Sequence, residues 1–145
     1  MFTFLREFEN LNFVEVVQRL AERASIPIEF EMTPSQREEH SDKETLRTLH
    51  EHVAKRWETT LANDARAEAA RVYLAKRSIS DEAVKRFRLG FAPDEWSDTM
   101  NWAKSKKYDP KLLEKGGLAI AGDKGHYDRF RGRLIFPICD EQGRV

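Results

Sequence analysis

Residues 127–138 place three arginines at alternate positions, directly before an apolar run. In a β-strand, residues two positions apart face the same side of the sheet and lie roughly 6.6 Å from each other. Arg129, Arg131 and Arg133 are therefore predicted to form a row on one face of a strand, with Phe130 and Gly132 on the other face. Guanidinium groups are forked donors that match phosphate oxygens. This arginine row predicts a site for a polyphosphate or a nucleic-acid backbone.

The same pattern has a plainer interpretation. Alternate arginines also occur on the solvated face of an edge strand, or as partners of local acids, here Asp128 and Asp140. The formal net charge is zero, so the molecule as a whole is not expected to steer toward nucleic acid. Residues 1–60 carry 8 Lys and Arg against 12 Asp and Glu, whereas residues 61–145 carry 17 against 13. An anion site therefore belongs to the C-terminal half.

The hydrophobic pattern predicts a mainly helical chain with a small antiparallel sheet in its C-terminal third, which is an α+β fold. A capping-box pattern at residues 41–44 is expected to open a long helix. Its buried face is supplied at helical spacing by Leu46, Leu49, Val53, Trp57 and Leu61. Further helices are expected within residues 1–26 and at residues 64–77, from 80, at 95–106 and from 109. Strands are expected at residues 118–121, 127–133 and 134–138.

The composition divides the chain into three parts. Residues 27–40 contain two prolines and little helical period, so they are predicted to be a linker between residues 1–26 and a domain of residues 41–145. Residues 140–143 resemble a hairpin turn whose return strand would start at Arg144, so only its first two residues are present. We therefore expect a fragment whose sheet is completed by further chain.

A complete catalytic centre is not expected within these residues. The single cysteine, Cys139, leaves no internal disulfide and no cysteine-based zinc site, and suits a reducing, cytosolic setting. No apolar stretch approaches the ~20 residues of a membrane-spanning helix. No carboxylate cluster suggests a two-metal site, and no glycine-rich phosphate loop is present.

Three further groups of residues have a functional and a structural interpretation. Lys85 and Arg86 begin a basic, aromatic cluster at a helix end, which either extends the anion surface or simply caps the helix. A cysteine-dependent enzyme using Cys139 and His126 would require a reactive thiolate. The three tryptophans fit core positions of helices better than base-stacking surfaces: Trp57, Trp96 and Trp102.

Several motifs in order resemble bacterial replicative DNA primase, the enzyme that makes short RNA primers on single-stranded DNA. Residues 2–24 are similar to the helices that follow the zinc ribbon in that family. Residues 73–77 and 86–93, with Trp96, resemble the start of its RNA polymerase domain, and residues 127–138 resemble its signature strand pair. Family members often carry a basic residue where this chain has Cys139, which puts in doubt any phosphate contact at that position.

The resemblance implies a role for each matching residue. Arg86, Arg129 and Arg131 would carry most of the contact with a single-stranded template and RNA primer, assisted by Arg133, Lys85 and Lys124. It also implies that residues 1–26 end the zinc-binding module and that residues 41–145 are the N-terminal, truncated part of the polymerase domain.

The same resemblance implies what lies outside these residues. The zinc ligands would precede Met1 and the carboxylate-bearing Toprim subdomain would follow Val145, so this segment is expected to bind but not to catalyse. The parent enzyme would work in the cytoplasm with Mg²⁺ or Mn²⁺, one structural Zn²⁺ and nucleoside triphosphates, and would meet the replicative helicase through other regions. The rival from another class is a non-enzymatic helical adaptor for a protein partner, favoured by the zero net charge and the acidic N-terminal half.

Overall fold

The computed structural model describes residues 2–8, 13–26, 34–123, 125–140 and 143–145, which form two compact units, Met1–Glu38 and Glu39–Val145. In the first unit, helices α1 (Phe2–Phe8) and α2 (Phe13–Ala24) form where the sequence predicts helices, and they pack against each other. The assignment of these units to a zinc-binding module and a polymerase subdomain stays a prediction.

The long helix α3 spans Pro34–Asn63 and begins earlier than predicted. Residues 34–40 of the predicted linker are therefore helical, and residues 27–33 lie outside the described part of the chain. The role of residues 27–40 as a linker stays a prediction. Two features explain the earlier start. Proline is well suited to the first helical turn, where its missing N–H has no helical partner, and the following Gln, Arg and Glu residues are strong helix formers. The expected capping box at residues 41–44 consequently lies inside the helix.

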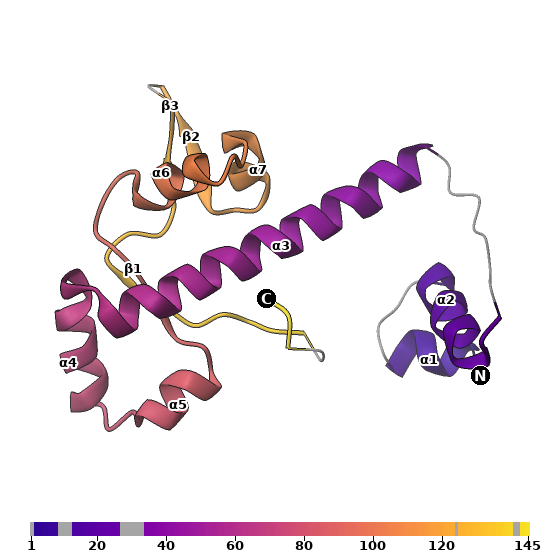
Figure 1. The fold of residues 1–145 in the computed structure, drawn as a ribbon, viewed down its shortest axis with the longest axis horizontal. Helices are drawn as coiled ribbons and strands as arrows, with labels where there is room; N and C mark the ends of the chain where they lie inside the picture. Colours follow the sequence, from indigo (N-terminus) through magenta and orange to yellow (C-terminus); the bar gives the residue numbers. More distant parts are fainter. Residues whose placement is uncertain (1, 9–12, 27–33, 124, 141–142) are drawn as a thin grey trace. The chain divides into compact units, whose positions relative to one another are not determined.

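Helix α3 supplies the centre of the core. Four of the five residues of its predicted apolar face are buried, and the fifth, Leu46, is half-buried. Leu49, Val53 and Trp57 are buried in a cluster with residues of α6 (Asp98–Ser105), α7 (Pro110–Lys115) and β2 (Ala119–Gly122). Leu61 belongs to a second cluster with the short 3₁₀ helix η1 (Ala65–Ala67) and α4 (Glu68–Lys76). Figure 1 shows α6, α7 and the β2–β3 hairpin on one side of α3, and α4 and α5 (Asp81–Arg86) on the other.

Two small antiparallel sheets complete the second unit, as the predicted α+β class requires. Strand β2 pairs with β3 (Gly125–Asp128), and β1 (Gly90–Ala92) pairs with β4 (Arg133–Ile135). Strand β1 was not predicted, because three residues carry too little period to be recognised. Gly90 allows β1 to lie on α3, since a Cβ at this position would come within 2.7 Å of the Trp57 Cβ. The predicted return strand at residues 144–145 is not formed, although the Asp140 N–H donates to the Arg144 carbonyl (2.9 Å).

Candidate nucleic-acid interface

An exposed aromatic and cationic surface forms where β3 meets the start of α6. The Arg131 guanidinium carbon lies 4.0 Å from the centre of the Trp96 ring and 5.5 Å from that of Tyr127. The two rings meet edge to face, with centroids 5.5 Å apart. Trp96 remains 64% exposed. We call Trp96, Tyr127 and Arg131 the Trp96 platform. It offers both an aromatic face and a cation, the two groups that proteins use to hold single-stranded nucleic acid.

A buried carboxylate holds the platform in place. Asp128 is only 1% exposed, and its two oxygens accept hydrogen bonds from the N–H groups of Thr99 (2.7 Å) and Met100 (2.9 Å) in the first turn of α6. Asp128 therefore caps a helix that is distant in the sequence, because Ser97, directly before α6, makes no side-chain cap. Burial raises the pKa of Asp128 despite these two hydrogen bonds.

Backbone contacts tie the same residues together. The Asp128 N–H donates to the Trp96 carbonyl (2.9 Å), which links the strand that carries Tyr127 to the loop that carries Trp96. Arg131 donates from Nη1 to the Asp128 carbonyl (2.7 Å). The platform is thus positioned from two sides, by the capped start of α6 and by the end of β3.

The predicted arginine row on one face of a strand is wrong. Strand β3 ends at Asp128 and β4 begins at Arg133, so residues 129–132 turn between two different sheets. Gly132 takes a left-handed φ of 58° within this turn. Phe130 packs on Trp57 with ring centroids 5.7 Å apart, which pulls the turn toward the core. The chain must leave the β2–β3 sheet to reach β1, and this breaks the alternation that a single strand would have kept.

The three arginines therefore have different environments. Arg131 is half-buried in the Trp96 platform, whereas the Arg129 side chain is exposed and its N–H donates to the Leu118 carbonyl (3.0 Å). Arg133 is exposed and lies opposite Ala92 in the β1–β4 sheet.

The other predicted contacts are not gathered at the platform. Arg86 and Lys85 are exposed at the end of α5, on the other side of α3 from the β2–β3 hairpin (Figure 1). The Arg86 guanidinium lies 5.9 Å from the centre of the Phe87 ring. Among the residues that the structure describes, no ion pair, hydrogen bond or ring contact joins Arg86 or Lys85 to Arg131. Lys124 lies outside the described residues.

Arg88, in the same basic cluster, is a structural residue. Its guanidinium donates to both oxygens of Glu51 (2.6 and 3.0 Å) and to Glu58 (2.9 Å), so it joins the end of α5 to α3. The hydrogen bond from Arg88 lowers the pKa of Glu51, and these acids raise the pKa of Arg88. Arg88 is therefore engaged by carboxylates.

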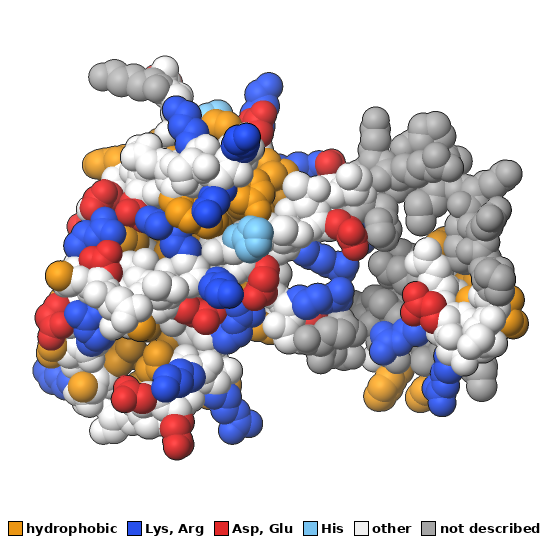
Figure 2. Space-filling view, in the orientation of Figure 1, with side chains coloured by type: hydrophobic (Ala, Val, Ile, Leu, Met, Phe, Trp, Pro, Cys, Tyr) orange, Lys and Arg blue, Asp and Glu red, His pale blue; other side chains and the backbone are white. Residues whose placement is uncertain are grey.

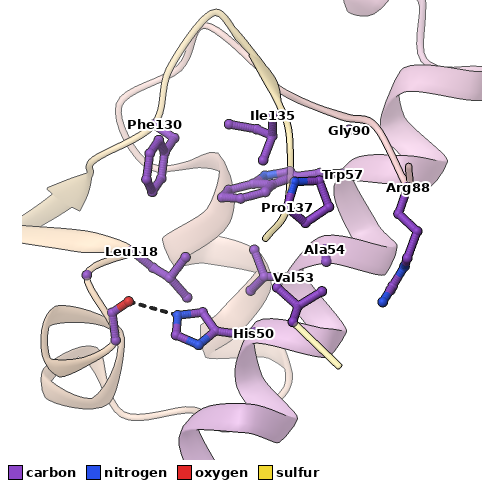
Figure 3. A pocket seen from close by; sticks show the side chains of 13 residues that line it. His50, Val53, Ala54, Trp57, Arg88, Gly90, Leu118, Phe130, Ile135 and Pro137 are labelled. Atoms are coloured by element: carbon purple, nitrogen blue, oxygen red, sulfur yellow. Dashed lines mark hydrogen bonds between the residues drawn. The ribbon is translucent and has the colours of Figure 1, made fainter. Parts of the chain in front are cut away.

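The pocket drawn in Figure 3 is a gap in the apolar core. It has a volume of about 180 Å³ and lies between α3 and the segment that follows β4, with Trp57, Leu118 and Phe130 among its walls. The His50 Nε2–H donates to the Gly116 carbonyl (2.8 Å) at its edge (Figure 3). Such a small, largely apolar space does not suit a phosphate.

The remaining candidate chemistry has no geometric support. His126 is bonded through Nε2 to Glu114 (2.9 Å), and Cys139 is exposed, so no contact within the described ranges pairs these two residues as an enzyme would require. No group of three or more His, Cys, Asp or Glu side chains suited to a metal ion occurs among the described residues. In this described part of the chain, no helix combines the length and apolar character needed to cross a membrane.

Trp96 is the residue that sequence reasoning misplaced. It was predicted to be a core position of a helix, but α6 begins only at Asp98 and the ring lies in the preceding loop. The signal was available, because Trp96 follows Pro93 and two acids, a context that favours a loop. Trp57 is buried and Trp102 half-buried on their helices, as predicted.

Comparison with known proteins agrees with the motifs. Residues 57–145 match the family model for the DNA primase catalytic core, N-terminal domain. A DNA primase of Halalkalibacterium halodurans is 35% identical over 99% of this chain and 24% of its own length. A DNA primase of Escherichia coli strain K12 is 37% identical over 98% of this chain and 25% of its own length. The chain thus spans about a quarter of the length of these curated relatives.

The fold comparison gives the same result. A solved structure of the DnaG primase catalytic domain bound to ssDNA superimposes with a TM-score of 0.69 and 34% sequence identity, covering 73% of this chain and 34% of that one. The family match extends over more than half of the residues, and it includes the Trp96 platform and the Asp128 cap. The chain belongs to the DNA primase catalytic core, N-terminal domain family.

Proposed function

We propose that this segment holds single-stranded nucleic acid for a DNA primase, with the Trp96 platform as its principal contact. The observation that carries the proposal is an exposed Trp96 ring with the Arg131 guanidinium stacked 4.0 Å from its centre. Any base can stack on the aromatic ring, because stacking does not depend on which base it is, and an arginine can contact the adjacent phosphate. Tolerance of sequence is what an enzyme that starts primers on many templates needs.

The surrounding arginines extend this contact. Arg129 directly follows the capping Asp128 and is exposed, and Arg133 is exposed at the start of β4. Arg86 and Lys85 would contact only a strand that continues to the other side of α3, so their share is smaller than that of Arg129 and Arg131. Lys124, which lies outside the described residues, is proposed from the sequence alone.

In this proposal, other parts of the parent enzyme carry out the chemistry of primer synthesis. Primer synthesis from nucleoside triphosphates needs metal ions held by acids, and the described residues offer no such group. We propose that the polymerase metals, Mg²⁺ or Mn²⁺, and a structural Zn²⁺ are held by other parts of the same cytoplasmic enzyme, which also meet the replicative helicase. This segment then positions template and primer without reacting.

Binding of a labelled single-stranded oligonucleotide, followed by fluorescence anisotropy, tests the proposal. Trp96→Ala is expected to weaken binding by about 1–3 kcal/mol, which is roughly 5- to 150-fold. Arg131→Ala is expected to lower the salt dependence by about 0.7 in the log–log slope, the value for one phosphate contact on a single strand. Phe136→Ala, which removes an equally exposed aromatic ring, and Arg47→Ala, which removes an exposed cation on α3, serve as matched controls.

The proposal is overturned if Trp96→Ala and Arg131→Ala, both shown to be folded by circular dichroism, bind the oligonucleotide as tightly as the unmodified chain does. The adaptor alternative then gains weight. Its structural support is the stacked pair Phe4 and Phe8 on α1, whose ring centroids are 5.3 Å apart and whose side chains are more than half exposed.

A further inference from the structure

A second cationic hollow lies between α3 and α6, beyond the Trp96 platform. It has a volume of about 290 Å³ and is lined by His52, Lys55, Arg56, Thr59, Trp102 and Lys106. The α3 members follow at helical spacing, so they form one stripe that faces the end of α6. We call this site the α3–α6 hollow. In Figure 2, lysine and arginine side chains gather around hydrophobic surface where α6 and α7 meet α3.

The hollow carries more positive charge than its acids balance. Arg56 donates to Asp98 (2.5 Å), but Asp98 also accepts from Arg66 (3.1 Å). Lys55 and Lys106 are exposed, and no side-chain hydrogen bond or ion pair is formed by either within the described residues. The Arg56 Nε–H is buried without an acceptor. Among the three cations of the hollow, only Arg56 contacts a carboxylate in the described structure, and that carboxylate, Asp98, also accepts from Arg66.

The hollow also has an aromatic wall. The Arg56 guanidinium lies 5.5 Å from the centre of the Trp102 ring, and Tyr108 is tilted against Trp102 with ring centroids 6.3 Å apart. His52 is bonded through Nδ1 to the Tyr108 hydroxyl (2.7 Å), which closes this wall. Cations beside an arginine stacked on tryptophan repeat the chemistry of the Trp96 platform.

Helix α6 connects the two sites. Trp96 precedes the first residue of α6, Asp98, by two positions, and Trp102 follows Asp98 by one helical turn, about 6 Å along the axis. Arg56 spans that turn, because it donates to Asp98 and lies over Trp102. A single-stranded nucleic acid that leaves the Trp96 platform along α6 would therefore reach the hollow within a few nucleotides.

We propose that the α3–α6 hollow is a second phosphate site for the same single strand, one that extends the contact beyond the Trp96 platform. This inference rests on the proposed function. Lys55 and Lys106 contact backbone phosphates, and the Arg56–Trp102 pair supports them from the wall. An acidic peptide could satisfy the same cations, but the position of the hollow along α6 favours the strand that the platform holds.

Oligonucleotides of two lengths separate the two sites. An oligonucleotide of about 4 nucleotides covers one site, and one of about 12 nucleotides covers both. In the 145-residue chain, the double variant Lys55→Ala with Lys106→Ala is expected to bind the longer strand several-fold more weakly and to lower its salt slope by about 1.4, which is two phosphate contacts. Affinity for the shorter strand should not change.

The matched control is Lys43→Ala with Lys111→Ala, which removes the same charge from exposed positions on α3 and α7. In ¹H–¹⁵N spectra, the Trp102 indole signal, assigned with Trp102→Phe, should shift with the longer strand and not with the shorter one. A poly-glutamate peptide of equal charge tests the peptide alternative, because its tighter binding at the hollow would overturn the assignment to a strand.

The outcomes distinguish the two proposals. If both strand lengths bind but the hollow variant and its control behave alike, the hollow is not a phosphate site and the platform proposal stands. If the hollow variant weakens both lengths equally, the lysines act only through general electrostatics and the inference fails. If the unmodified chain binds neither strand, the platform proposal fails first and the hollow has no strand to extend.

Discussion

Replacing Asp128 by alanine is expected both to destabilise the Glu39–Val145 unit and to weaken binding at the proposed nucleic-acid interface. The side chain is buried and accepts the N–H groups of Thr99 and Met100, which begin α6. Without the carboxylate these two donors have no acceptor, and buried donors cannot turn to water. The same change loosens the attachment of β3 to the Trp96 loop.

The expected loss follows from these two hydrogen bonds. Each buried N–H that is left without an acceptor costs about 1–3 kcal/mol. Removing the buried carboxylate also removes its desolvation cost, which offsets part of the loss from the two N–H groups. We expect a decrease of about 2–4 kcal/mol in the free energy of unfolding. At about 4 °C per kcal/mol for a domain of this size, the melting temperature should fall by roughly 10 °C.

Thermal and urea unfolding followed by circular dichroism measure this loss. Asp109→Ala is the matched control, because Asp109 caps α7 from an exposed position through one hydrogen bond to the Lys111 N–H (2.8 Å). It should cost about 1 kcal/mol. Asp128→Asn keeps one acceptor and should give an intermediate loss. At a temperature where all variants are folded, only the Asp128 variants should bind single strands more weakly.

The pH dependence gives a separate check with a defined sign. Burial raises the pKa of Asp128 above its ordinary value of 3.8, so the folded state holds this proton more tightly than the unfolded chain. The contribution of Asp128 to stability is then fully present below pH 3.8 and decreases as the pH rises through the raised pKa. The cost of Asp128→Ala should accordingly be larger at pH 3 than at pH 7. A cost no larger than that of Asp109→Ala, or one that grows with pH, would refute the reasoning.

Three further substitutions test the packing and charge of the second unit. Gly90→Ala should cost about 1–3 kcal/mol in urea unfolding, because its new Cβ would meet the Trp57 Cβ at 2.7 Å; an unchanged midpoint would show that β1 can shift. Gly132→Ala should cost about 1 kcal/mol, since alanine disfavours its φ of 58°, and a neutral result would indicate that the turn relaxes. Arg88 lowers the pKa of Glu51 below its ordinary value of 4.5, so this pair stabilises the fold above pH 4.5 and the stabilisation is lost as the pH falls through the lowered pKa. Arg88→Leu should therefore make the free energy of unfolding less sensitive to acid. Urea unfolding at a series of pH values measures this, and an unchanged pH profile would contradict it.

Local signals in the sequence predicted much of the helical framework. Ser80 caps α5 by accepting from the Ala83 N–H (3.2 Å), and Asp109 caps α7, as their patterns indicate. The apolar stripe of α3 is buried as its spacing predicts. These features depend on residues within one or two helical turns, so their physics is contained in the sequence itself.

The sequence by itself determined the α+β class, the caps of α5 and α7, most of the buried face of α3 and the presence of three arginines in residues 129–133. Only the tertiary structure decided how the side chains of residues 127–133 are arranged. Residues 127–133 could have continued as one strand, but β3 pairs with β2 and β4 with the distant β1, so the arginine row is broken between two sheets. Asp128 caps α6 and Trp96 is left exposed beside Arg131 for the same reason. Alternation along a strand is local, whereas the choice of pairing partner and of buried cap depends on which distant backbone groups the packed core brings within reach.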